Sequence, residues 1–291
     1  MKKILAIAIL FSVLGISCEK EEGAKAQVIP PVQVKVPDPN FYIFLSFGQS
    51  NMEGHAPFEP QDMVVDKRFQ VLEGLNCENL HRNKGIWYTA VPPLCRCYTG
   101  LTPGDYFGRS LVSALPANIR IGIINVSVGG SQIELFDKNG YQNYVNNAPD
   151  WLKGVVNEYG GNPYGRLIEL AKIAQKDGVI KGILLHQGES NNGDAEWPNK
   201  VKGIYTNILN DLNLKSASVP LLAGEVVNGD HGGLAANMNK IIAKLPDVIP
   251  NSYVISSAGC PCGADSLHFT AEGYRMLGKR YAAKMMPLLG Y

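Results

Sequence analysis

Apolar runs typical of strands alternate with helical patterns from residue 41 onward, and this alternation restricts the fold more than any other feature. The candidate strands are residues 41–48, 120–128, 181–187, 219–227 and 252–257. Helical patterns follow Asn162-Pro163, run through residues 201–212 and follow Thr270. The alternation favours an α/β fold, a parallel sheet with helices on both faces, because parallel strands need crossover helices. No internal repeat or change of composition divides this region, so we expect one domain.

Polar clusters follow several of these strands and predict where a site lies. They are residues 48–51, 127–131, 186–191 and the segment from Asp265 to His268. Ligands of open α/β sheets bind at the C-terminal edge of the strands, so we expect these clusters to converge there. Ser50, His268 and Asp265 supply a hydroxyl, an imidazole and a carboxylate. Acyl transfer through a covalent ester requires these groups, because the His removes the serine proton and the carboxylate orients the His.

Four motifs in this order resemble the SGNH hydrolase superfamily: Gly48-Gln49-Ser50-Asn51-Met52, Gly129-Gly130, Gln187-Gly188-Glu189-Ser190 and Asp265-x-x-His268. Within it they look like the sialate O-acetylesterase and acetylxylan esterase branch, carbohydrate esterase family six. The resemblance spans residues 41 to about 285. It implies a flavodoxin-like three-layer α/β/α sandwich with a central parallel sheet. It also implies a serine esterase that removes acetyl groups from xylan or sialic acid. Ser50 lacks the flanking glycines of the α/β-hydrolase elbow.

The resemblance makes Ser50 the nucleophile, His268 the general base and Asp265 the residue that orients the base. Asp265 is also suited to capping its own turn. In that case Glu189, or with less support Glu225, would orient the imidazole. His231 is a rival for the base, in a segment that resembles a helix-entry loop.

An oxyanion hole must accompany these residues. The backbone N–H groups of Ser50 and Gly130 are candidates, since glycine permits close backbone approach. Gln187 stands where many SGNH enzymes carry an Asn side chain, so the resemblance makes its amide a third candidate donor.

The irregular segment 53–105 carries many Pro, Gly, Cys and aromatic residues, and such excursions usually build a binding site. Candidate substrate-binding residues are Asn51, Glu189 and Trp87, and the alternative for Asn51 is a hydrogen bond to the loop instead of the substrate. Sugar rings stack on aromatic faces, although core packing is the commoner role of a Trp. The other aromatic candidates in irregular stretches are Tyr88, Tyr106, Tyr141, Tyr144 and Trp151. The sequence has no metal-ligand spacing and no phosphate or nicotinamide motif, and the expected catalysis needs no cofactor.

The N-terminal segment has the pattern of an export signal. Lys2-Lys3 precede an apolar run, residues 4–14, that is too short to span a bilayer, and Gly15-Ile16-Ser17-Cys18 resembles a bacterial lipobox. We expect a lipoprotein signal peptide over 1–17, lipidation of Cys18, a tether over 18–37 and an SGNH-type esterase domain over 38–291. The acidic residues 19–22 resemble the export signals of surface lipoproteins. The expected location is the outer membrane of a Gram-negative bacterium, facing the periplasm or the surface. A signal peptide cleaved elsewhere is the alternative.

Charge and cysteine content restrict the partners and the covalent links. The formal charge is +1 and no basic stripe is visible, so nucleic-acid binding is not expected. Five cysteines follow Cys18: Cys77, Cys95, Cys97, Cys260 and Cys262. A bridge between the 95/97 pair and the 260/262 pair, a zinc site and buried thiols all remain open.

Two other functions fit parts of the same pattern. One is a broader SGNH lipase or thioesterase, although residues 53–105 contain no obvious apolar strip for a long acyl chain. The other is a non-catalytic glycan-binding surface lipoprotein, against which the complete Ser, His and Asp set argues.

Overall fold

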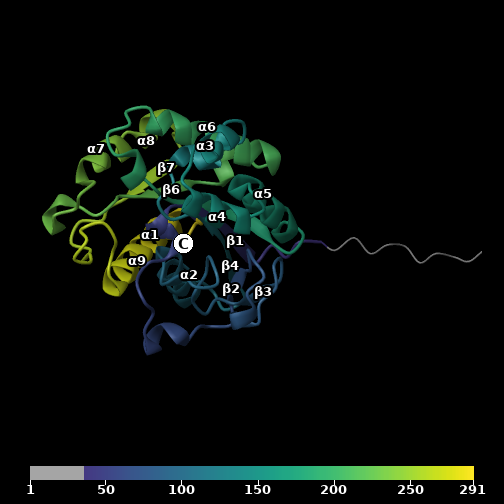
Figure 1. Ribbon diagram of the computed structural model, residues 1–291. Coiled ribbons are helices and arrows are strands. Elements are labelled where there is room, and N and C mark those ends of the chain that lie inside the picture. Colours follow the sequence, from purple (N-terminus) through teal and green to yellow (C-terminus); the bar gives the residue numbers. More distant parts are fainter. Residues whose placement is uncertain (1–35) are drawn as a thin grey trace, which may run out of the picture. The chain divides into compact units, whose positions relative to one another are not determined.

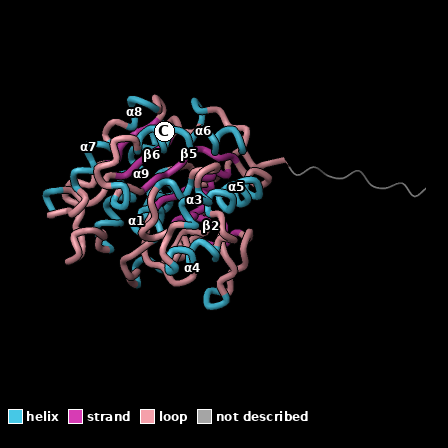
Figure 2. The backbone as a smooth tube through the Cα atoms, turned by 45° about the horizontal axis from the view of Figure 1, so that its top comes forward, coloured by secondary structure: helices cyan, strands magenta, loops and turns pink. Residues whose placement is uncertain are grey.

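A seven-stranded sheet forms the centre of the computed structural model, which describes residues 36–291. The strands lie in the order β3-β2-β4-β1-β5-β6-β7, and every pair is parallel except the edge pair β2–β3. Figures 1 and 2 show the strands running between layers of helices. The bounds are β1 (Phe41–Gly48), β2 (Phe69–Leu72), β3 (Trp87–Thr89), β4 (Arg120–Ser127), β5 (Val179–His186), β6 (Leu221–Gly224) and β7 (Ser252–Ile255).

Helices cover both faces of this sheet, which confirms the predicted three-layer α/β/α fold. Successive strand residues point to opposite faces, so Ile43 and Leu45 of β1 join one core and Phe44 joins the other. The helices α2 (Pro103–Ala114) and α9 (Ala271–Leu288) pack together on the face of Phe44. The other face is covered mainly by α4 (Asp150–Glu158), α5 (Pro163–Ala174) and α6 (Trp197–Asp211). Shorter helices are α1 (Ser50–Glu53), α3 (Tyr141–Asn146), α7 (Asn239–Ile242) and α8 (Leu245–Val248).

The predicted helix starts are confirmed by side-chain caps. Asn162 accepts a hydrogen bond from the N–H of Gly165 at the start of α5, and Thr270 accepts one from Gly273 at the start of α9. The predicted strands all form, with ends that shift by up to three residues. Two strands and a helix start were missed in the irregular segment 53–105: β2, β3 and the beginning of α2, which Thr102 caps.

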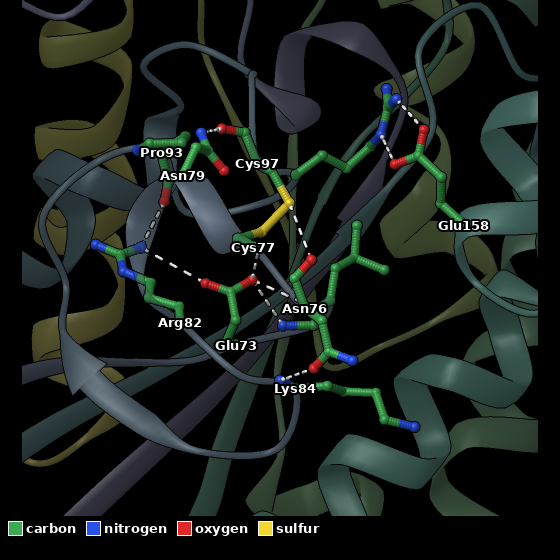
Figure 3. Close-up of a disulfide and its surroundings, with 12 residues drawn as sticks. Glu73, Asn76, Cys77, Asn79, Arg82, Lys84, Pro93, Cys97 and Glu158 are labelled. Atoms are coloured by element: carbon green, nitrogen blue, oxygen red, sulfur yellow. Dashed lines mark hydrogen bonds and ion pairs between the residues drawn. A yellow bond between two sulfur atoms is a disulfide. The ribbon is translucent and has the colours of Figure 1, made fainter.

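One disulfide, between Cys77 and Cys97, ties part of this segment together. Their Cα atoms lie 5.2 Å apart, a usual separation for a bridge. The bridge considered between the 95/97 and 260/262 pairs does not form: Cys95, Cys260 and Cys262 are free. Figure 3 shows how Asn79 and Arg82 brace the surrounding loop. Asn79 donates to the backbone oxygen of Cys97, and Arg82 donates to that of Pro93.

The predicted leader, Cys18 and most of the tether lie outside the described residues, so these boundaries remain predictions. Within residues 36–291, no helix has both the length and the apolar character that crossing a membrane would require.

Candidate active site

Ser50 begins α1 directly after β1, which is the central strand of the sheet. Gly48 permits this exit, because a Cβ atom there would lie only 2.1 Å from the backbone oxygen of His186 on β5. Asp265 and His268 lie in the loop between β7 and α9. The structure therefore brings together, at the C-terminal edge of the sheet, residues that are more than 200 positions apart in the chain.

Ser50, His268 and Asp265 form a continuous relay. Ser50 Oγ lies 2.8 Å from Nε2 of His268, and Nδ1 of His268 lies 2.7 Å from Oδ2 of Asp265. The second carboxylate oxygen of Asp265 accepts hydrogen bonds from the backbone N–H groups of Leu267 and His268. Although partial burial opposes the effect, these bonds and the imidazole hold the pKa of Asp265 below its ordinary value. The carboxylate is therefore ionised where it faces the ring.

The alternative orienting acids and the rival base lie elsewhere. Both ring nitrogens of His268 are engaged by Ser50 and Asp265, so neither Glu189 nor Glu225 occupies the orienting position. Glu225 instead accepts hydrogen bonds from Ser256 and Ser257 in the loop after β7. His231 lies in a short 3-10 turn after β6 and does not line the pocket that contains Ser50.

Asn51 is buried and does not face a substrate, which corrects its predicted role. Its Nδ2 donates to the backbone oxygen of Leu267 and to Glu189. Its Oδ1 accepts from the hydroxyl of Tyr274 and from the N–H of Phe269. Two of these bonds, to Leu267 and Phe269, join the nucleophile helix to the loop that carries His268, and the others join it to the turn after β5 and to α9. Asn51 therefore fixes the separation of the serine and the imidazole.

Glu189 lines the same pocket, but its carboxylate points into the protein. Its Oε1 lies 2.5 Å from Nδ2 of Asn51, and its Oε2 is buried with no hydrogen-bond partner among the described residues. Burial raises the pKa of Glu189 above its ordinary value. Its contact with Asn51 supports the relay. The predicted contact with substrate is not made, because both carboxylate oxygens lie inside the protein.

Two backbone N–H groups at the pocket are available for an oxyanion. Within residues 36–291, the N–H groups of Ser50 and Gly130 donate to no protein atom, whereas the N–H of Gly129 bonds to the carboxylate of Glu53. Gly130 has a φ of +70°, and a Cβ atom there would lie 2.7 Å from the ring of Trp151. Only glycine fits this turn without strain.

Gln187 is not an oxyanion donor, contrary to the prediction. Its side chain is buried, and its Nε2 donates to Gln49, to Asn191 and to the backbone oxygen of Ser131. Its Oε1 accepts from Nε1 of Trp197. The amide is fully used beneath the pocket, so none of its donors can reach a substrate.

Gln49 has the free amide that Gln187 lacks. Its Oε1 accepts from the side chain of Gln187 and from the N–H groups of Gly188 and Ser190, which identifies that atom as the oxygen. Its Nε2 has no partner among the described residues, and Gln49 lines the pocket beside Ser50. The motif residue next to the serine, which the sequence analysis did not single out, therefore supplies the third candidate donor.

The catalytic pocket has a volume of about 440 Å³, and most of the described residues that line it are polar or charged. Of the described residues, three with apolar side chains line it: Trp151, Val155 and Leu267. His55 stacks on His268 with ring centroids 3.8 Å apart. Burial and the neighbouring His268 lower the pKa of His55, so this ring is neutral at pH 7.

Arg96 is the only Lys or Arg that lines this pocket in the described part of the chain. Its guanidinium donates to Glu53 at 2.9 Å and to both carboxylate oxygens of Glu158, at 2.6 and 3.1 Å. The positive charge is therefore matched by two carboxylates. Sequence reasoning missed Arg96 because it belongs to no motif, and only the fold of segment 53–105 brings it to the serine.

Trp87 lies far from the site, which corrects its prediction as a sugar-binding residue. Its ring packs on Phe41 at the first residue of β1, and its Nε1 donates to Asp177. Seven residues of extended strand, about 23 Å, separate Phe41 from Gly48 at the site end. Among the aromatic candidates, Trp151 is the one that lines the pocket, and it is 59% exposed.

The parallel α/β/α sandwich and the Ser–His–Asp relay at its edge define an SGNH-type ester hydrolase. A sequence model described as "Carbohydrate esterase, sialic acid-specific acetylesterase" matches residues 40–287. The chain belongs to this family, and it is a carboxylic ester hydrolase.

Solved structures share the fold. A protein from Arabidopsis thaliana aligns with a TM-score of 0.66 and 22% identity over 86% of this chain and 99% of its own. NanS aligns with a TM-score of 0.63 and 15% identity, over 88% of this chain and 99% of its own. A carbohydrate acetylesterase from Xanthomonas citri aligns with a TM-score of 0.56 and 20% identity, over 82% of this chain and 54% of its own. At these identities the likeness concerns the fold alone.

Proposed function

We propose that this protein removes O-acetyl groups from carbohydrates through an acyl-enzyme intermediate on Ser50. The observation that carries the proposal is the relay from Asp265 through His268 to Ser50, in a pocket with unpaired N–H donors. The family match and the similarity to the Xanthomonas citri protein, a carbohydrate acetylesterase, support acetylated carbohydrate as the substrate class. Acetylated xylan and O-acetylated sialic acid are the two candidates.

The chemistry follows from the positions of the donors and acceptors. Ser50 Oγ attacks the acetyl carbonyl carbon while Nε2 of His268 takes its proton. The resulting oxyanion accepts hydrogen bonds from the N–H groups of Ser50 and Gly130, with Nε2 of Gln49 as the third donor. The imidazolium, stabilised by Asp265, then protonates the sugar oxygen as its bond to the acetyl carbon breaks. Water, deprotonated by His268, attacks the acetyl-serine ester and releases acetate.

The walls of the pocket favour a short acyl group. A long acyl chain gains about 0.8 kcal/mol for each methylene that it buries in apolar surroundings. Among the described lining residues here, only Trp151, Val155 and Leu267 are apolar. Trp151 beside the Gly129-Gly130 turn offers its exposed face to the sugar that carries the acetyl group.

We expect kcat/KM to fall at least about tenfold from 4-nitrophenyl acetate to the butyrate and further to the octanoate. The measurement uses the mature chain and the three esters at equal concentration, followed by assays of acetate released from acetylated xylan and O-acetylated sialic acid. A higher kcat/KM on octanoate would support the lipase or thioesterase instead. Hydrolysis of nitrophenyl acetate without acetate release from either glycan would contradict the carbohydrate substrate.

We also propose that the enzyme is a lipoprotein anchored through Cys18 to the outer membrane of a Gram-negative bacterium. The charged and apolar leader and the residues before Cys18 support this. The Cys18→Ala variant, expressed in a Gram-negative host, is expected no longer to partition into the detergent phase or to be recovered with the membrane fraction. Immunoblots of both fractions check this against the wild type. Equal recovery with the membranes would contradict lipidation at Cys18.

A further inference from the structure

A second pocket adjoins the catalytic one. It has a volume of about 470 Å³, and it shares His55 with the pocket that contains Ser50. Because the ring of His55 stacks on His268, this pocket begins one ring away from the general base. A molecule whose ester lies at Ser50 could extend past His55 into this space.

The second pocket has aromatic walls with exposed faces. Tyr98 is 87% exposed and Phe58 is 37% exposed, and Pro57, Leu80 and Pro93 add further apolar surface. Exposed aromatic rings beside a catalytic site offer flat apolar faces on which the C–H face of a sugar packs. Thr99 and Asn79 add polar atoms along the same walls.

The wall that carries Tyr98 is covalently held. Cys97, the residue before Tyr98, is bridged to Cys77, and its backbone oxygen accepts a hydrogen bond from Asn79 (Figure 3). Arg82 braces the opposite end of this loop through the backbone oxygens of Val91 and Pro93. A wall held in place before binding loses less conformational freedom when a ligand arrives, so these contacts favour a preformed binding site.

The charges of the two pockets select against an acidic ligand. Between residues 36 and 291, no Lys, Arg, Asp or Glu lines the second pocket. In the catalytic pocket, the guanidinium of Arg96 is already matched by Glu53 and Glu158. A carboxylate on the substrate would therefore meet no uncommitted Lys or Arg among the described lining residues, and it would lie near the carboxylates of Glu53 and Glu158, which outnumber Arg96.

From these observations we propose that the second pocket binds an uncharged sugar next to the acetylated one. The substrate is then a neutral acetylated oligosaccharide or polysaccharide, bound across His55 with its neighbouring sugar against Tyr98 and Phe58. This inference rests on the proposed acetylesterase function and narrows its substrate class. Of the two candidates, it favours an acetylated neutral chain such as xylan over the acidic sialic acid.

The first experiment measures how chain length affects turnover. Acetate release is followed with acetylated neutral xylo-oligosaccharides of one to four sugars, and kcat/KM is divided by the value for 4-nitrophenyl acetate. We expect this ratio to rise from the monosaccharide to the disaccharide or trisaccharide. Tyr98→Ala and Phe58→Ala should each lower the ratio for the longer substrates about three- to tenfold, mainly through KM. Tyr98→Phe keeps the ring and should retain the wild-type ratio.

A structural defect would give a different result from lost sugar binding. Misfolding lowers hydrolysis of both kinds of substrate, so the ratio stays constant, and a constant ratio in both alanine variants overturns the proposal. Equal kcat/KM for one sugar and for several also overturns it, while the acetylesterase function stands. If no glycan releases acetate although nitrophenyl acetate is hydrolysed, the proposed function itself fails and the inference falls with it.

The second experiment isolates charge. O-acetylated sialic acid is compared with its methyl ester, which differs only in lacking the carboxylate charge, and acetate release is measured at low and high salt. We expect the methyl ester to have the higher kcat/KM, by several-fold at low salt, with a smaller difference at high salt because ions screen the repulsion. A preference for the free acid would overturn the proposal.

Discussion

Ser50→Ala is expected to lower kcat by about 10⁴-fold or more on both nitrophenyl acetate and acetylated glycan. The substitution removes only the hydroxyl that lies 2.8 Å from His268, and the residue is partly exposed at the start of α1. The fold and the free energy of unfolding should therefore change little. The measurement is initial-rate kinetics with a thermal melt, and Ser256→Ala, a serine outside the pocket, is the matched control.

The result for this variant also separates the competing functions. If Ser50→Ala and the wild type release acetate equally, Ser50 is not the nucleophile. If neither protein hydrolyses any ester but both bind glycan, the non-catalytic binding protein is the better account. A variant that no longer turns over but still binds acetylated oligosaccharide would support the esterase. It would also allow binding at the second pocket to be measured without hydrolysis.

The sequence was sufficient to predict the fold and the relay for a physical reason. The parallel strands β4, β1 and β5 are neighbours and end at the same edge of the sheet. The polar residues that follow them therefore converge there, independently of the structure of the segments between them. Ser50 follows the central strand, and the loop from Asp265 to His268 precedes the well-patterned helix α9. Strong periodicity and motif order thus identified the residues of the relay before any distance was known.

The wrong predictions concern side-chain direction, which neither spacing nor motif order determines. Gln187 belongs to the motif after β5, but Trp197 and Asn191 take up its amide beneath the pocket. Gln49, one position before the serine, faces the pocket instead. Asn51 similarly turns inward toward Tyr274. In each case a buried hydrogen-bonding partner from another segment decided where the amide points.

Segment 53–105 was predictable in its role but not in its structure. Its strands β2 and β3 have four and three residues, too few for a clear alternation of apolar and polar positions. Cys97 pairs with Cys77 rather than with either cysteine of the 260/262 pair. Arg82, in the loop that contains Cys77, binds the backbone oxygens of Val91 and Pro93 and so holds the chain after β3 against this loop. Connectivity of this kind follows from the fold and not from cysteine spacing.

Asp265→Asn is expected to lower kcat by about 10²–10⁴-fold with little change in KM. The asparagine oxygen can still accept from the N–H groups of Leu267 and His268, which turns its NH₂ group toward Nδ1 of the imidazole. The ring must then accept at Nδ1 and carry its proton on Nε2, where it can no longer remove the proton of Ser50. Asp265 is partly exposed, so water limits the loss, and the effect should fall below that of Ser50→Ala.

Glu189→Gln decides between the two acids that the sequence left open. The glutamine oxygen still accepts from Asn51, so the support of the nucleophile helix is retained. Burial raises the pKa of Glu189 and so favours its neutral form. A neutral glutamine amide resembles that form more closely than it resembles an ionised carboxylate. We therefore expect kcat to stay within about tenfold of wild type, since both ring nitrogens of His268 keep their partners. Parallel measurement of both variants at one pH tests the assignment. A loss for Glu189→Gln as large as that for Asp265→Asn would mean that the buried carboxylate, and not Asp265 alone, controls the imidazole.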